Sequence, residues 1–183
     1  VRRSRLLVLP SRQMAKTVRR CYPGTGPRMV ILPWGGWREE FPEREIEEEA
    51  QRLGEHFQIR SHSRVLLTLS RISPEKGIHY LLEALRLLEE KKALRNEELC
   101  LFVCGETAFM RGEAYGRKVR RAAEKLKRVR VFFPGYLSAF DKQAYFRLAN
   151  LFVSPSVHES YGLTLVEAMQ GGLPVLASDH YGV

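Results

Sequence analysis

The stretch RVLLTLSRISPEKG, residues 64–77, decides the fold of this chain. Its first half, residues 64–70, is a short apolar run that predicts a buried β-strand. Directly after it, Ser73 is a good helix N-cap and Pro74 a good first helical residue. Apolar side chains then recur at helical spacing, at Ile78, Leu81, Leu82, Leu85 and Leu88.

The alternation of strand and helix continues through the rest of the sequence. Further strands are expected at residues 99–104, 129–133, 151–153 and 174–177. Helices are expected at residues 117–128, 138–149 and 163–170, the second opened by a Ser138 and Asp141 pair at capping-box spacing. This order predicts an α/β fold with a Rossmann-like, doubly wound parallel sheet and helices on both faces. Such sheets bind ligands at the carboxyl ends of their strands, so the chemistry is expected in the loops that follow them.

Residues 1–60 follow a different pattern. Strands are expected at residues 6–9 and 29–32, a short basic helix at 13–21, and an acidic helix at 43–57. These elements are too few for a domain of their own, so we expect the tail of a missing domain and a linker. The sequence also lacks an initiating Met and stops where a further helix would be expected. We therefore expect the domain to be truncated at both ends.

The net charge of +9 is concentrated in one predicted helix, at residues 117–128. Its apolar stripe is formed by Val119, Ala122, Ala123 and Leu126. The pattern predicts an amphipathic helix with a solvated basic face. The alternative is a face that docks on a membrane surface or a polyanion. Because neither an aromatic-interleaved RNA-binding pattern nor a helix-turn-helix signature is present, we expect no nucleic-acid partner.

The cysteines and the apolar content indicate the compartment. Cys21, Cys100 and Cys104 are too few and too irregularly spaced for a disulfide framework or a zinc site, and the last two are expected to be buried thiols. No stretch approaches the roughly 20 apolar residues that span a bilayer, and the basic N-terminal segment lacks the apolar run of a signal peptide. We expect a cytoplasmic protein, peripheral on the inner face of a membrane if the basic helix docks there.

The loop after the first strand of the sheet carries two cations, Arg71 and Lys76. Lys76 is expected in the first helical turn, where the helix dipole disfavours a cation. A cation becomes favourable there if an anion docks at the same helix end, and Arg71 can converge on that anion with a planar fork of donors. The alternative interpretation is two solvated charges in a loop.

A second loop, at residues 155–162, leads into a helix and is bracketed by two acids. Gly162 has no side chain, so a phosphate can approach the free amides of residues 160–163. Glu167, one turn into the helix, can accept two hydrogen bonds from a ribose diol, and Glu159 can bind sugar hydroxyls or offset developing positive charge. The alternative is simple stabilisation of the helix start by negative charge.

Three further residues stand near this second loop. His158 could act in proton transfer beside Glu159, although a hydrogen-bonded structural histidine is the favoured interpretation. His180 and Tyr181, beyond the last strand, could also border the site. No cluster with metal-ligand spacing is present, so no metal is expected.

Several motifs in order resemble the retaining glycosyltransferases of family 4. They are residues 71–77, Phe133-Pro134-Gly135-Tyr136-Leu137, and residues 155–172 followed by Leu173-Pro174-Val175. The segment from Glu159 to Glu167 is similar to the E-x7-E signature of that family. The resemblance covers about residues 28–183 and implies a GT-B fold, in which two Rossmann-like domains face each other across a cleft. Residues 29–36, with Trp34, depart from the family's usual Pro-Asn-Gly-Val-Asp linker.

The resemblance implies a role for each site residue. Arg71 and Lys76 would bind the donor diphosphate, with help from the backbone of Ser160, Tyr161, Gly162 and Leu163. Glu159 would be the catalytic residue at the transferred sugar, and Glu167 would hold the ribose. Tyr136 and Leu137 would line the base pocket. The family usually needs no divalent metal, and no cofactor is implied beyond the UDP-, GDP- or ADP-linked sugar donor.

The sequence thus predicts the nucleotide-sugar-binding C-terminal domain of a glycosyltransferase. Residues 1–32 would be the tail of the N-terminal acceptor domain, 33–60 a linker and helix, and 61–183 the donor domain. The whole enzyme would move a sugar to a hydroxyl of a carbohydrate or lipid-linked acceptor with retention, while this chain alone would bind nucleotide without turnover. The alternatives are another GT-B enzyme, such as a nucleotide-sugar epimerase or a phosphorylase-like protein, and a non-catalytic nucleotide- or membrane-binding module.

Overall fold

The fold is built on a five-stranded parallel sheet. The computed structural model describes residues 4–24, 28–36, 39–94, 97–107 and 112–179. The strands run in the order β5-β4-β3-β6-β7 and all neighbouring pairs are parallel. Their bounds are β3 (Arg64–Leu69), β4 (Leu99–Cys104), β5 (Val129–Gly135), β6 (Leu151–Ser154) and β7 (Val175–Ala177). The predicted parallel sheet is confirmed.

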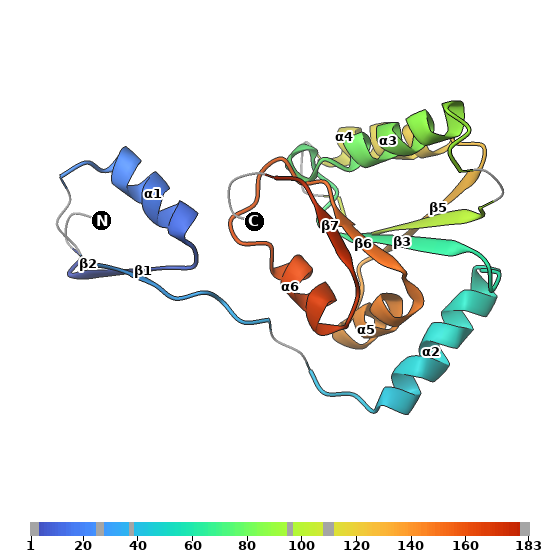
Figure 1. The fold of residues 1–183 in the computed structure, drawn as a ribbon, viewed down its shortest axis with the longest axis horizontal. Coiled ribbons are helices and arrows are strands. Elements are labelled where there is room, and N and C mark those ends of the chain that lie inside the picture. Colours follow the sequence, from blue (N-terminus) through green and yellow to red (C-terminus); the bar gives the residue numbers. More distant parts are fainter. Residues whose placement is uncertain (1–3, 25–27, 37–38, 95–96, 108–111, 180–183) are drawn as a thin grey trace.

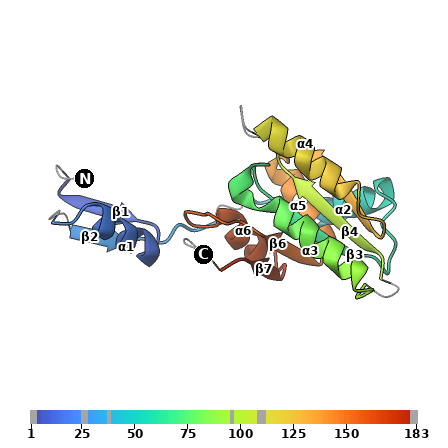
Figure 2. The same cartoon turned by 90° about the horizontal axis from the view of Figure 1, so that it is seen from above.

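Helices cover both faces of this sheet, as a doubly wound fold requires (Figure 1). One face carries α3 (Ile78–Glu90) and α4 (Gly112–Ala123), which lie side by side in Figure 2. The other face carries α2 (Glu43–His56), α5 (Ala139–Leu148) and α6 (Leu163–Gln170). Two separate hydrophobic clusters therefore flank the sheet, one under each helical layer.

Strand β4 shows why the apolar runs of the sequence are continuous rather than alternating. All six of its residues are buried, because it lies inside the sheet with helices above and below. Leu99, Leu101 and Val103 face the α3–α4 layer, whereas Cys100, Phe102 and Cys104 face the opposite layer. Burial raises the pKa of the Cys100 and Cys104 thiols, so both stay protonated near neutral pH. They are the buried thiols that the sequence predicts.

Two element boundaries differ from the sequence prediction. Helix α4 begins at Gly112 and ends at Ala123, so the basic residues from Lys125 to Arg128 follow the helix instead of lying on it. Strand β5 continues through Pro134 to Gly135. Proline is tolerated there because β5 is an edge strand, so its missing N–H interrupts no central ladder.

The N-terminal part forms a small unit of its own. Strands β1 (Leu6–Leu9) and β2 (Arg28–Ile31) pair in parallel, with α1 (Arg12–Cys21) between them in the chain. The unit lies beside the large sheet in Figure 1 and is joined to α2 by the linker. Helix α2 packs on α5, where the Arg147 guanidinium lies 2.8 Å from the Glu43 carboxylate and 2.9 Å from that of Glu47. The division of the chain into domains stays a prediction.

Neighbouring strands β3 and β6 bring two loops together at their carboxyl ends. The first loop is residues 70–77 and the second is residues 155–162. The carbonyl of Glu75 accepts hydrogen bonds from the amides of Val157 and His158, at 2.9 and 3.4 Å. Gly77 has φ of 64°, and a Cβ at that position would lie 2.0 Å from the carbonyl oxygen of Pro155. Only glycine allows the two loops this close.

The turn in the first loop corrects one prediction. Pro74–Lys76 is a separate 3₁₀ turn, the Ser73 side chain makes no capping hydrogen bond, and Gly77 is the N-cap of α3. Lys76 therefore does not lie in the first turn of the long helix. The left-handed conformation of Gly77 separates the two helical segments. The dipole argument for a cation at the start of α3 thus does not apply, and Lys76 acts through its side-chain contacts.

Replacement of Phe102 by Ala should destabilise the domain strongly. Its ring is fully buried and contacts the rings of Phe57, Phe132 and Tyr145. We expect a loss of about 3–5 kcal/mol in the free energy of unfolding, measured by urea denaturation. Tyr136→Ala is the control, since that side chain is 74% exposed and should cost less than about 1 kcal/mol. Equal losses for the two variants would contradict the placement of Phe102 in the core.

Replacement of Gly77 by Ala should push the two loops apart. Gly172 offers a matched control, because its φ of 75° is also positive but a Cβ there has nothing within 4 Å. Gly172→Ala should cost about 1–2 kcal/mol, from backbone conformation alone. Gly77→Ala should cost clearly more in the same urea experiment, because the methyl group also meets Pro155. Similar costs would show that the loops can separate without penalty.

Candidate functional site

The two loops and the linker enclose a hollow at the carboxyl ends of β3 and β6. We call it the central hollow; its volume is about 210 Å³. It is lined by Trp34, Leu69, Ser70, Arg71, Lys76, Glu159, Ser160, Tyr161, Gly162, Leu163 and Thr164. The structure thus brings together the residues that the sequence places at a diphosphate and a transferred sugar. These residues come from distant parts of the sequence, and they meet because β3 and β6 are neighbouring strands of the sheet.

An ion pair crosses the central hollow. The Lys76 ammonium lies 2.5 Å from a carboxylate oxygen of Glu159, and the two side chains are only 14% and 17% exposed. The other carboxylate oxygen of Glu159 accepts a hydrogen bond from the Ser160 amide, at 3.2 Å. Because water is largely excluded, this attraction is less screened than that of a surface pair. An anion that replaced the Glu159 carboxylate would therefore contact the Lys76 ammonium and the Ser160 amide.

The start of α6 supplies further anion-binding groups. Gly162 caps the helix in a left-handed conformation with φ of 81°, and no side chain bonds to the first amides. Within the described part of the chain, the amides of Tyr161, Gly162 and Leu163 have no hydrogen-bond acceptor. Free amides at a helix N-terminus attract anions. The Ser160 amide already donates to the Glu159 carboxylate, and its contact with a diphosphate stays a prediction.

Arg71 lies at the rim of the central hollow. Its side chain is 69% exposed, and its guanidinium is 3.6 Å from the Glu75 carboxylate. An exposed arginine with one loose ion pair can reorient towards a ligand at little cost. Lys76, Arg71 and the amides of α6 together can bind an anion with several negative oxygens, such as a phosphate ester.

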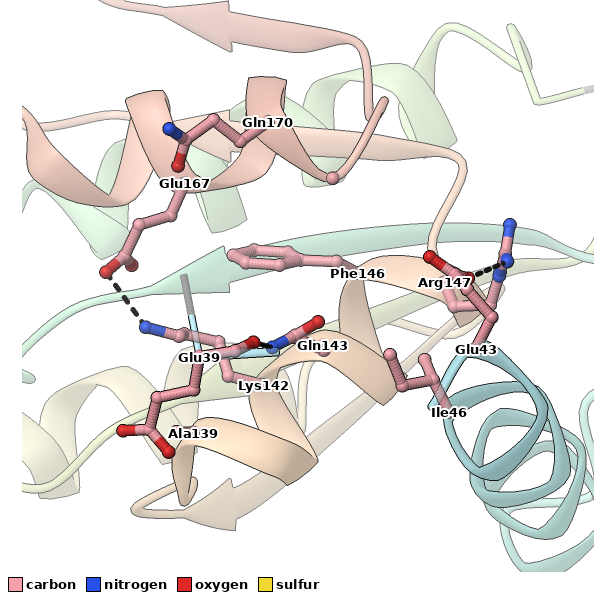
Figure 3. Close-up of a pocket in the computed structure, with 11 residues that line it drawn as sticks. Glu39, Glu43, Ile46, Ala139, Lys142, Gln143, Phe146, Arg147, Glu167 and Gln170 are labelled. Carbon is pink, nitrogen blue, oxygen red and sulfur yellow. Dashed lines mark hydrogen bonds and ion pairs between the residues drawn. The ribbon is translucent and has the colours of Figure 1, made fainter. Parts of the chain in front are cut away.

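Glu167 lines a second pocket, between α2, α5, α6 and the linker (Figure 3). This interhelix pocket also has a volume of about 210 Å³. The Glu167 carboxylate lies 2.9 Å from the Lys142 ammonium of α5, and the side chains are 20% and 23% exposed. Sequence reasoning missed Lys142. Its position one turn after the N-cap Ser138 places it near the start of α5, but nothing in the sequence indicates that it pairs with Glu167.

The remaining candidates that the structure describes line neither pocket. Leu137 is buried in the core under α5 and α6, and Tyr136 is 74% exposed, so the predicted base pocket stays a prediction. His158 is exposed, its backbone amide donates to the first loop, and its imidazole has no hydrogen-bond partner among the described residues, so its role stays a prediction. His180 and Tyr181 lie outside the described residues.

Neither a candidate metal cluster nor a candidate membrane-spanning helix is found among the described residues. These residues contain no group of three or more His, Cys, Asp or Glu side chains that could hold a metal ion. Each helix that the structure describes falls short of the length and apolar character that a bilayer crossing requires.

Two curated bacterial proteins are among the relatives of this sequence. Over 150 residues it is 29% identical to the alpha-monoglucosyldiacylglycerol synthase of Streptococcus pneumoniae, covering 80% of this chain and 32% of that protein. Over 134 residues it is 34% identical to the lipopolysaccharide 1,2-N-acetylglucosaminetransferase of Salmonella typhimurium, covering 72% and 34%. The chain therefore spans about a third of the length of these relatives.

Solved structures and a family match complete the comparison. WaaG, a glycosyltransferase involved in lipopolysaccharide biosynthesis, superposes with a TM-score of 0.70 at 25% identity, covering 96% of this chain and 45% of that one. Anabaena HepE, solved with UDP-glucose, gives 0.72 at 20% identity, covering 99% and 47%. Residues 50–183 match the family described as Glycosyl transferases group 1. Because that match covers most of its residues, this chain belongs to the group 1 glycosyl transferases and has the Rossmann-like fold of GT-B structures.

Proposed function

We propose that this chain is the C-terminal, donor-binding domain of a retaining glycosyltransferase of family 4. The whole protein would transfer a sugar from a nucleoside-diphosphate sugar to a hydroxyl group. One observation carries the proposal: Lys76, Glu159 and the free amides of α6 converge on one hollow at the carboxyl ends of a parallel sheet. In a member of the group 1 glycosyl transferases, that hollow has the charges a sugar diphosphate needs.

The diphosphate is assigned to the cationic side of the central hollow. The Lys76 ammonium and the amides of residues 161–163 bind it, and Arg71 folds in from the rim. When the bond from the anomeric carbon to the phosphate oxygen breaks, negative charge grows on the leaving diphosphate. Fixed positive groups at that place stabilise the transition state more than the bound donor. In this proposal the reaction needs no divalent metal.

Glu159 is assigned to the transferred sugar. The incoming diphosphate takes over Lys76, which frees the Glu159 carboxylate. That carboxylate can then accept hydrogen bonds from sugar hydroxyls and offset the positive charge of an oxocarbenium-like transition state. The acceptor hydroxyl bonds to the anomeric carbon on the face that the diphosphate leaves and gives its proton to an oxygen of the leaving diphosphate, so the configuration is retained.

The nucleoside is assigned to the pocket that contains Glu167. Glu167 accepts hydrogen bonds from the ribose hydroxyls, with Lys142 as its present partner, and Tyr136 and Leu137 border the base. The acceptor is a carbohydrate or a lipid-linked hydroxyl, in keeping with the names of the streptococcal and Salmonella relatives.

A peripheral membrane contact is a second proposal, carried by the basic side of α4. Arg117, Lys118 and Arg121 of this helix line a shallow hollow together with Lys125, which follows the helix, and all four side chains are exposed. Among them, Arg117 lies 3.9 Å from the Glu113 carboxylate, a weak surface pair. Such a face can lie against anionic headgroups, and a lipid-linked acceptor would place the enzyme at that surface.

Nucleotide binding tests the donor site. The protein should bind UDP, GDP or ADP in a calorimetric titration, and Lys76→Ala should weaken the diphosphate about 10- to 100-fold through loss of a charge-assisted hydrogen bond. Arg71→Ala should weaken it less, because Arg71 is at the rim. Lys91→Ala, at an exposed site away from both pockets, is the control. Glu159→Gln should leave the diphosphate affinity unchanged or raise it, since it frees Lys76.

Two results would overturn the donor site. One is absence of binding of all three nucleotides at millimolar concentration. The other is an equal loss of affinity for nucleosides and nucleoside diphosphates in Lys76→Ala, because a phosphate-binding cation must distinguish the two.

Vesicle sedimentation tests the membrane contact. The triple variant Arg117→Gln, Lys118→Gln, Arg121→Gln should bind phosphatidylglycerol vesicles at least about tenfold more weakly, since each cation near the surface contributes about 1 kcal/mol. The matched control is Arg44→Gln, Arg52→Gln, Arg64→Gln, which removes the same charge from exposed sites elsewhere. Equal losses in both variants, or no binding by the unaltered protein, would show that the face of α4 is merely solvated.

A further inference from the structure

We propose that Trp34 is a stacking platform for the sugar ring of the donor. The proposal rests on the donor site described above and deepens it, because it names a residue that selects for the sugar rather than for the nucleotide. Trp34 belongs to the linker, whose sequence departs from the usual linker of family 4. It lines the central hollow together with Lys76 and Glu159.

The first observation is the exposure of the Trp34 side chain. The residue is 50% exposed, although it borders a hollow whose other side carries an ion pair. Leaving half of an indole in water forfeits part of the free energy that burying its apolar surface would give. An exposed aromatic face beside convergent polar groups is a common feature of ligand sites.

The second observation is that Trp34 is held in place at its backbone. The Tyr161 hydroxyl donates a hydrogen bond to the Trp34 carbonyl at 2.6 Å, and the two rings lie 5.8 Å apart at an angle of 57°. Tyr161 itself belongs to the second loop, directly before the start of α6. The linker is thereby fixed to the loop that carries the anion-binding amides.

The third observation is a second attachment of the same linker segment to α6. The Gln170 side-chain amide donates to the carbonyl of Gly36 at 3.5 Å, and a Cβ on Gly36 would lie 2.2 Å from the Gln170 side-chain oxygen. Attachments on both sides of Gly35 keep the indole close to the central hollow. An aromatic ring that is placed in advance loses little conformational entropy when a ligand stacks on it.

The charged groups of the central hollow indicate that the ring stacking on Trp34 is a sugar ring. A sugar phosphate held by Lys76 places its pyranose ring next to the phosphate, and therefore near Glu159 and Trp34. One face of a pyranose presents mainly C–H bonds, which carry partial positive charge, while the face of an indole is negative. The hydroxyls at the ring edge remain available to the Glu159 carboxylate. Apolar stacking and polar contacts then act on one sugar at the same time.

The test compares a nucleoside diphosphate with its sugar-linked form. The chain has two tryptophans, so a Trp37→Phe background leaves Trp34 as the single tryptophan, whose emission can be excited selectively over that of tyrosine. In this background, the nucleotide that binds best among UDP, GDP and ADP is titrated alone and as its glucose derivative. We expect the glucose derivative to bind more tightly and to shift the Trp34 emission, whereas the nucleotide alone leaves that emission nearly unchanged.

Two variants assign the difference to the Trp34 ring. Trp34→Ala should lower the affinity for the glucose derivative about tenfold while preserving that for the nucleoside diphosphate. Trp34→Phe, which keeps an aromatic face and serves if the alanine variant folds poorly, should retain most of the preference. Circular dichroism of both variants verifies the fold.

Each other outcome has a definite meaning. A preserved preference for the glucose derivative in Trp34→Ala would overturn the inference and leave the donor site standing. An equal loss for nucleotide and derivative would place Trp34 against the nucleoside instead, and would overturn it too. Absence of any nucleotide binding by the unaltered protein would overturn the proposed function, and the inference with it.

Discussion

The site depends on the contact between the first and second loops. The Glu75 carbonyl accepts hydrogen bonds from two amides of the second loop, and Gly77 lets the two backbones approach to a distance that no other residue allows. Without that contact, Lys76 and Glu159 would belong to separate surface loops. With it, they form a mostly buried ion pair beside the free amides of α6. The arrangement of the candidate site is thus a consequence of backbone packing at the carboxyl ends of two interior strands.

Much of the fold could be predicted because its strands are buried on both faces. A run such as Leu99–Cys104 has to be apolar throughout, and its bounds are visible in the sequence. The ends of helices that are set by polar residues were harder to predict. The start of α4 carries too little apolar periodicity to show itself, and a Ser-Pro pair marks a 3₁₀ turn as well as it marks an α-helix. Only the left-handed backbone of Gly77 distinguishes the two.

The sequence indicated which residues belong to the candidate site, but not which of them form ion pairs with one another. Glu159, Lys76 and Gly162 could be found from residue types placed after strands. Their partners depend on which strands are neighbours, and the order β5-β4-β3-β6-β7 cannot be deduced from a pattern that runs along one chain. The Lys142–Glu167 pair required the packing of α5 against α6 in the same way. Both glutamates are thus neutralised in advance, so a ligand has to exchange these ion pairs rather than fill an empty charged site.

Pro134 has a consequence for how this protein meets its neighbours in solution. It lies in β5, the edge strand next to β4, and lacks the N–H that an added strand would need. A parallel sheet with an open edge is a template for extension by another chain. Pro134, one residue before the end of β5, therefore disfavours the pairing of another strand at that position, in the same segment that leads to Tyr136.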